Sequence, residues 1–126
     1  MDLYIHKCKG ITSKGKIIWF NSNGRGIIHC QNKDLISLEI YNGIKAIFCN
    51  HNKLEKLITP IGVECVHCFN NNLTELIIPK SVIMLHCQNN RLKKLKIPKN
   101  IAYLECDKNL IDNKYINKEI NITVHY

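Results

Sequence analysis

The sequence predicts a solenoid, a stack of short coils built mainly from extended chain with little α-helix. Three observations support this fold class. Cysteines recur 19 residues apart, at Cys30, Cys49, Cys68, Cys87 and Cys106. Apolar residues occupy the same positions around each of these cysteines, and asparagine and proline each keep a position of their own. A repeat of fixed length is the sequence signature of a stacked architecture, so we expect about five coils in register.

The apolar positions predict one short strand and a share of a continuous core for each coil. We number each repeat so that its cysteine is position 6. Position 4 then holds Ile28, Ile47, Val66, Leu85 and Leu104. Position 11 holds Leu35, Leu54, Leu73, Leu92 and Ile111. Residues two apart on a strand point to the same side, so positions 4 and 6 should both face the core.

Asparagine and proline predict how each coil turns. Position 9 holds Asn52, Asn71, Asn90 and Asn109. An asparagine amide can bond backbone groups of neighbouring coils, so we expect a ladder of stacked asparagines. All prolines of the chain share one later column, at Pro60, Pro79 and Pro98. Proline there disfavours a regular helix, and so short a coil has no room for a long one, so we expect extended or 3₁₀ segments on the far side.

The two ends of the chain depart from the repeat and predict caps. Residues 1–24 contain two β-leaning runs, Leu3 with Ile5 and then 17–20, around a Lys- and Gly-rich stretch that we expect to turn. We interpret them as an N-terminal cap, hairpin-like, with Trp19 packed on the first repeat. The array itself spans 25–115. Residues 116–126 alternate in polarity and predict a C-terminal cap strand, in which Ile122 and Val124 continue positions 4 and 6; all three parts form one domain.

The repeat resembles the leucine-rich repeat, L-x-x-L-x-L-x-x-N-x-L, with cysteine in the sixth position. The segments VIMLHCQNNRL (82–92) and IKAIFCNHNKL (44–54) carry the resemblance most clearly. The short, cysteine-containing unit is similar to repeats of giant-virus, AT-rich protist and bacterial effector proteins. The resemblance implies a curved solenoid with a parallel sheet on its concave side and extended or 3₁₀ segments on its convex side. It also implies binding of other macromolecules.

The concave face is the first candidate site. Positions 3 and 5 should point away from the core, and position 7 follows them. The residues expected to bind a partner are Phe48, Cys65, His67, Phe69, Met84, His86, Tyr103 and Glu105. Aromatic residues and Met are enriched at protein interfaces and Lys is depleted there, which fits this set. Two alternatives remain open, because apolar residues simply suit a sheet and a second copy of the chain could also cover the face.

A basic rim is the second candidate site. It comprises Lys80, Arg91, Lys93, Lys94, Lys96 and Lys99, in a chain of net charge +8. Such a cluster could contact nucleic acid or another acidic surface. A solvated rim is the plainer interpretation, and AT-rich codons for lysine could account for the charge. No aromatic residues alternate with these cations, which argues against single-strand binding.

The cysteines and histidines do not predict a metal, cofactor or redox site. Thiols in a parallel ladder stand in a row without the convergence that zinc requires. Cys65 and Cys68 form a C-x-x-C sequence, but residues three apart on a strand face opposite sides. His67 and His86 should be neighbours about 5 Å apart, which alone does not make a metal site. We expect buried, structural cysteines in the repeat.

Three functional hypotheses follow. We expect a non-enzymatic protein-binding module, because the chain contains no familiar catalytic or nucleotide-binding motif. The alternatives are a basic binder of nucleic acid or an acidic surface, and a self-assembling structural protein. An odd number of cysteines without a secretory signal predicts free thiols and an intracellular location. No apolar run approaches the ~20 residues of a membrane span. The sequence does not identify the partner.

Overall fold

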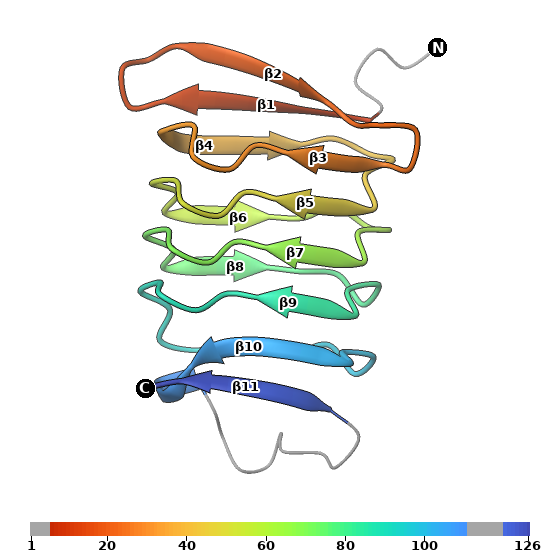
Figure 1. The fold of residues 1–126 in the computed structure, drawn as a ribbon, viewed down its shortest axis with the longest axis vertical. Coiled ribbons are helices and arrows are strands. Elements are labelled where there is room, and N and C mark those ends of the chain that lie inside the picture. Colours follow the sequence, from red (N-terminus) through yellow and green to blue (C-terminus); the bar gives the residue numbers. More distant parts are fainter. Residues whose placement is uncertain (1–5, 111–119) are drawn as a thin grey trace.

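Each repeat contributes one short strand to a six-stranded parallel sheet (Figure 1). A computed structural model describes residues 6–110 and 120–126. The sheet has the order β11-β10-β9-β7-β5-β3. Its strands are β3 (Ile27–His29), β5 (Ala46–Phe48), β7 (Cys65–His67), β9 (Met84–His86), β10 (Tyr103–Asp107) and β11 (Asn121–His125). The chain is therefore a parallel β-solenoid of about five turns, and the predicted repeat and its 19-residue spacing are confirmed.

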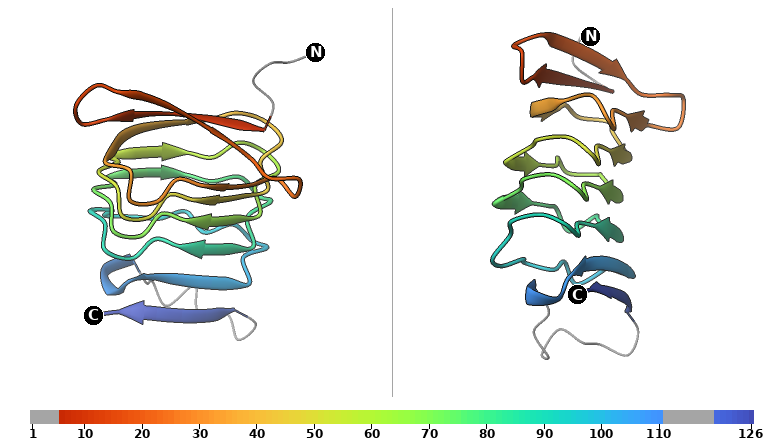
Figure 2. Two further views of the ribbon diagram at one scale, coloured as in Figure 1. Left: turned by 45° about the horizontal axis from the view of Figure 1, so that its top comes forward. Right: turned by 60° about the vertical axis from the view of Figure 1, so that its left-hand side comes forward.

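The far side of each coil is extended, as predicted. It contains β4 (Leu35–Ile40), β6 (Lys56–Ile58) and β8 (Glu75–Ile77), of which β6 and β8 pair in parallel. Figure 2 shows these return strands as a layer separate from the six-stranded sheet. In the described ranges the one helical element is the 3₁₀ turn η1 (Lys108–Leu110), and no helix could span a membrane. The carbonyl of each proline accepts a bond from the N–H three residues later, which closes the turn toward the next strand.

The core lies between the two layers and is built from the predicted columns. The five position-4 side chains are at most 2% exposed, and the five position-6 cysteines are 0% exposed. The parallel register places equal positions side by side; for example, Val66 pairs with both Ile47 and Leu85. Burial of a Val or Leu side chain contributes roughly 1.5–3 kcal/mol, so these columns provide the main stabilisation of each coil. Ile111, the last position-11 residue, lies outside the described ranges.

The predicted asparagine ladder is present at Asn52, Asn71 and Asn90, whereas Asn109 donates to Leu92 O instead. Asn71 illustrates the ladder. Its side-chain Oδ1 accepts from Leu54 N at 3.0 Å, and its Nδ2 donates to the carbonyls of Cys49 and Cys68, both at 3.1 Å. Asn52 and Asn90 make the equivalent bonds with their own neighbours. Each amide thus satisfies buried backbone groups of two consecutive coils, which fixes the coils in register.

Position 8 shows a feature that the sequence analysis missed. In the first four repeats its residues adopt left-handed backbone conformation, with φ of 57° at Asn32, 59° at His51, 55° at Asn70 and 57° at Asn89. In the fifth repeat this position is Lys108, which begins η1 instead. Asn and His are among the residues that most readily occupy this region. The left-handed residue turns the chain between the inward cysteine and the inward asparagine, which explains the polar residues at this position.

The N-terminal segment forms a hairpin, but its first strand was predicted wrongly. Strand β1 (Lys7–Thr12) covers much of the stretch expected to turn, and it pairs with both β2 (Ile17–Asn21) and β4. The reason is an alternation that buries Cys8, Gly10 and Thr12. Gly10 is needed there because a Cβ would come within 2.7 Å of a Leu35 methyl group. Leu3 and Ile5 lie outside the described ranges.

The ends of the array show two further predicted contacts. Trp19 in β2 stacks on Tyr41 of the first repeat, with ring centroids 6.2 Å apart. In β11, Ile122 pairs with Leu104 and Val124 pairs with Cys106, so both residues continue positions 4 and 6 as predicted. Residues 116–119 of the predicted cap strand lie outside the described ranges, and β11 begins at Asn121.

Candidate interaction face

The open face is the surface formed by positions 3, 5 and 7 of the six-stranded sheet, on the side away from the core. In β5, for example, Ile47 points inward and is 0% exposed, whereas Ala46 and Phe48 are partly exposed. The structure places all eight predicted binding residues on this face. Seven lie in strands β5, β7, β9 and β10, and Phe69 lies two residues beyond the end of β7: Phe48, Cys65, His67, Phe69, Met84, His86, Tyr103 and Glu105.

A row of rings crosses the open face at position 5. It consists of His29, Phe48, His67 and His86, and we call it the ring row. Successive ring centroids are 4.8, 4.6 and 4.2 Å apart, close to the spacing of strands in a sheet. The His29–Phe48 and His67–His86 pairs are nearly parallel, with interplanar angles of 11° and 13°. The middle pair differs, because Phe48 meets His67 edge to face at an interplanar angle of 66°. Each near-parallel pair therefore covers one face of each of its two rings.

Glu105 ends the ring row between two histidines. Its Oε2 lies 3.2 Å from His86 Nδ1, and its Oε1 lies 2.6 Å from His125 Nε2. These contacts join β9, β10 and β11 on the open face. His125 was not among the predicted site residues. The register predicted for the C-terminal strand already placed it at position 7, which was the signal available in the sequence.

The environment of His67 keeps its imidazole neutral. Burial and, to a smaller extent, the adjacent His86 lower the pKa of His67 to about 4, against an opposing effect of Glu105. Histidine ordinarily titrates near about 6.5. His67 therefore remains uncharged through the pH range in which an exposed histidine becomes a cation, and the centre of the ring row stays apolar in character.

This pKa shift predicts an acid-sensitive fold. Unfolding releases His67 to its ordinary pKa near about 6.5, so the unfolded chain binds the proton more tightly. The contribution of His67 to stability is therefore fully present above that value and is lost as pH falls toward about 4. We expect the free energy of unfolding, measured with urea, to fall less between pH 7.5 and pH 5 in His67→Gln than in the original chain. An identical fall in both proteins would contradict this assignment.

Polar side chains border the ring row at positions 7 and 8. The ring of His51 meets Phe69 edge to face, with centroids 5.4 Å apart. Nε2 of His51 lies 2.7 Å from Asn70 Nδ2, and Asn89 Nδ2 donates to Asn70 Oδ1 at 2.7 Å. The open face therefore has an aromatic centre and a margin of amides that are fixed by one another, which resembles the apolar core and polar rim of protein interfaces.

The cysteines at position 6 act as core residues, because burial keeps their thiols from ionising. Burial raises the pKa of the Cys30 and Cys68 thiols to about 12, and it raises those of Cys49 and Cys87 well above the ordinary value. Cys65 lies on the open face and is only partly buried, so it faces away from Cys68 as expected. In the described residues no three His, Cys, Asp or Glu side chains are grouped to hold a metal.

Thiol labelling should distinguish Cys65 from the other cysteines. A brief exposure of the folded protein to a maleimide should add one label, at Cys65, because the thiolate is the reactive species and the other six thiols are buried. The rate should be below that of an unfolded chain, since burial also raises the pKa of Cys65. Intact-mass spectrometry reads the number of labels. The Cys65→Ser variant should take up none, and labelling of several cysteines in the folded protein would contradict the described packing.

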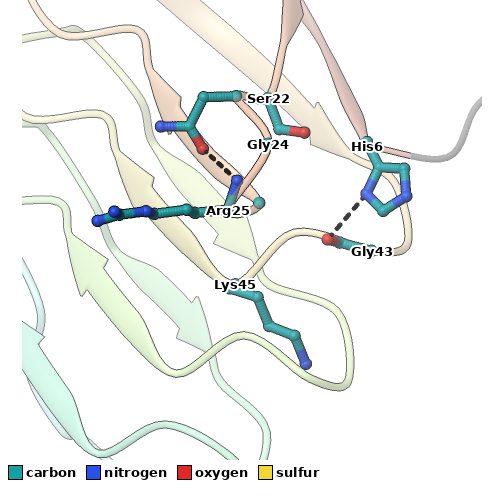
Figure 3. A pocket seen from close by; sticks show the side chains of 8 residues that line it. His6, Ser22, Gly24, Arg25, Gly43 and Lys45 are labelled. Carbon is teal, nitrogen blue, oxygen red and sulfur yellow. Dashed lines mark hydrogen bonds between the residues drawn. The ribbon is translucent and has the colours of Figure 1, made fainter.

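Two basic regions lie away from the open face. The six residues of the predicted basic rim are all exposed, and within the described ranges none forms an ion pair. A shallow cavity of about 500 Å³ near the N-terminal end is lined by His6, Arg25 and Lys45 among others. Figure 3 shows that Arg25 and Lys45 leave this cavity in different directions, so their charges do not converge on one point.

The chain matches no protein-family model, no curated protein sequence and no solved structure.

Proposed function

We propose that this chain is a non-enzymatic interaction module of the leucine-rich-repeat type, which binds a protein partner through the open face. The ring row carries the proposal. It places Phe48, His67 and His86 on adjacent strands, flanked by Met84 and Tyr103, on a rigid sheet. Residues fixed in this way lose little conformational entropy on binding, so their contacts contribute more to affinity.

The composition of the face supports a protein as the partner. Positions 3, 5 and 7 of the described strands contain aromatic, Met and His side chains and no lysine. Tyr103 is 49% exposed. Protein interfaces are enriched in aromatic residues and Met and depleted in Lys. A solvated sheet face would instead expose lysine and other long polar side chains.

The orientation of the rings argues against bases or sugars as the main ligand of this face. Single-stranded nucleic acid binds by stacking its bases on open aromatic faces. In the ring row each near-parallel pair, His29 with Phe48 and His67 with His86, covers one face of each ring. Phe48 and His67 also meet edge to face, which leaves less open ring face for a base. Ring edges carry C–H and N–H groups of partial positive charge, which complement carbonyl and carboxylate oxygens of a protein.

A pair of matched triple variants tests the proposal. Replacement of Phe48, Met84 and Tyr103 by Ala should remove the apolar contacts of the open face and weaken partner capture at least 100-fold, if each side chain contributes about 1 kcal/mol or more. The control replaces Ile36, Ile58 and Ile77, which are 47–49% exposed in the return strands, by Ala. Proteins captured from lysate of the source cell by the control but not by the face variant are then purified and titrated directly. Equal capture by both variants would refute the role of this face.

The basic rim supports a second candidate function, binding of nucleic acid or another acidic surface. The observation in its favour is that all six cations are exposed and, within residues 6–110 and 120–126, without ion-pair partners. The same capture experiment at low and high salt separates the two functions. Phosphate contacts release counterions and weaken steeply with salt, whereas apolar contacts through the open face do not.

A further inference from the structure

Strand β2 forms the N-terminal edge of the molecule. It is the outermost strand of the three-stranded sheet β2-β1-β4, and no other described strand pairs with its outer side. Figure 1 shows it at the end of the stack, beyond β1. An edge strand presents a row of backbone donors and acceptors that can pair with another strand.

The hydrogen bonds of the hairpin identify which residues present these groups. Thr12 N–H donates to Lys16 O, and Ser22 N–H donates to His6 O, both at 2.9 Å. Residues 16 and 22 of the second arm therefore direct their backbone groups toward β1. Because backbone groups alternate sides along a strand, the odd-numbered residues direct theirs outward. Ile17 and Asn21 are two of these, and both side chains are exposed.

β2 also lacks the features that usually block edge pairing. Its sequence is IIWFN, which contains no charged residue and no proline. Natural edge strands are commonly protected by lysine, proline or a bulge. The pairing of β2 with β1 is regular along its length, without a shift of register. Ile17 is 53% exposed, so an apolar side chain lies beside the free edge.

A two-fold axis through the middle of β2 gives a compatible register for a second copy. In antiparallel pairing about Trp19, Ile17 of one copy lies opposite Asn21 of the other. Ile18 then lies opposite Phe20, an aromatic–β-branched pair of the kind that stabilises sheets. Lys16 lies opposite Ser22, so no two lysines of the strand region meet directly. The outward groups of Ile17 and Asn21 alone would form four hydrogen bonds across the axis.

We propose that two copies of this chain associate through antiparallel pairing of their β2 strands, joining the molecules at their N-terminal ends. The three-stranded sheets of the two copies then form one continuous antiparallel sheet. We assign the edge to a second copy because antiparallel pairing about Trp19 satisfies the outward backbone groups of Ile17 and Asn21. The same pairing brings no two like charges of the strand region opposite each other. This association leaves the open face uncovered, and it does not depend on the function proposed for that face.

The charge of the protein predicts how salt affects this association. Each copy carries a net charge of +8, so the two copies repel each other at low ionic strength. The paired strands contain no ion pair. Salt screens the repulsion and leaves the hydrogen bonds and apolar contacts in place, so the dimer should become more stable as salt increases.

Two double variants test the pairing and its register. In Ile17→Lys with Asn21→Lys, like charges oppose each other at both ends of the paired strands. In Ile17→Glu with Asn21→Lys, the same two positions carry opposite charges across the axis. Both variants leave Trp19 and the bonds to β1 unchanged. Sedimentation velocity from about 1 µM to about 1 mM protein, a range that covers weak dimers, measures the assembly state.

We expect the original chain and the Glu/Lys variant to dimerise and the Lys/Lys variant to remain monomeric, with all three folded by circular dichroism. A monomeric original chain at the highest concentration would overturn the proposal. Dimerisation of the Lys/Lys variant as strong as that of the original chain would overturn it too, because the interface would lie elsewhere. Loss of the dimer in both variants would reject the two-fold register. If an extended peptide from another protein occupies the edge instead, the original chain stays monomeric by itself.

Discussion

Replacement of Asn71 by Ala is expected to lower the free energy of unfolding by about 3 kcal/mol or more, which is a large share of the stability of a small domain. Asn71 is 7% exposed, and its side chain accepts a hydrogen bond from Leu54 N and donates to Cys49 O and Cys68 O. Alanine would leave Leu54 N without a partner, at a cost of roughly 1–3 kcal/mol, and would remove one of two bonds to each carbonyl, at about 1 kcal/mol apiece. Cys49 O and Cys68 O would keep their bonds from Asn52 and Asn90. Urea unfolding followed by circular dichroism measures the change.

The adjacent residue supplies a matched control for this prediction. Asn72 is partly exposed, and its side chain makes no hydrogen bond within the described residues, although its backbone N–H donates to Leu54 O. Asn72→Ala should therefore change stability by no more than about 0.5 kcal/mol, as surface substitutions usually do. If Asn71→Ala and Asn72→Ala have equal effects, the ladder does not hold the coils together. Asn71→Asp should also destabilise, because a carboxylate has no donor for the two carbonyls.

Leu85→Ala should have an effect of similar size for a different reason. Leu85 is 0% exposed at position 4 of β9, and it pairs in register with Val66 on one side and Leu104 on the other. Removal of its side chain leaves a cavity in a core that continues through neighbouring coils. Leu→Ala changes of this kind cost about 2–5 kcal/mol. The same urea experiment measures the loss. If neighbouring side chains repack into the cavity, the loss should lie near the lower end of this range.

Ile83 is the control for the cavity. It lies two residues before Leu85, is 45% exposed, and its backbone bond to Glu64 O does not require its side chain. Ile83→Ala should lower stability by less than about 1 kcal/mol, because little apolar area is lost. A loss in Ile83→Ala as large as that in Leu85→Ala would show that burial of Leu85 does not account for its effect.

The open face and the β2 edge can be tested separately because they lie on different parts of the molecule. The open face belongs to the six-stranded sheet, whereas β2 belongs to the three-stranded sheet at its N-terminal end. The open face presents side chains, so its specificity depends on Phe48, Met84 and Tyr103. The edge presents backbone groups, so its specificity depends on register and on the charges placed beside it. A variant of one surface should leave the other unaffected.

Part of the candidate site could be predicted because a strict period fixes the direction of each side chain. Once position 6 is inward, positions 3 and 5 of every repeat must face outward, which places Met84 and His86 on the open face. The arrangement of those side chains could not be predicted in the same way. Ring angles depend on rotamers, and rotamers depend on neighbours in other coils. The near-parallel stacking of His67 on His86 and the position of Glu105 between two histidines are therefore results of the tertiary structure.

The sequence by itself determined the solenoid, its 19-residue coil, the core columns, the asparagine ladder and the continuation of the array into β11. Each of these follows from equal residues at equal spacing, which parallel stacking places side by side. The tertiary structure alone decided the fold of the non-repeating end. The segment from Lys7 to Thr12 is rich in Lys and Gly, yet it forms the central strand β1. Pairing with β2 and β4 and the close approach of Leu35 to Gly10 outweigh its weak local preference for a strand.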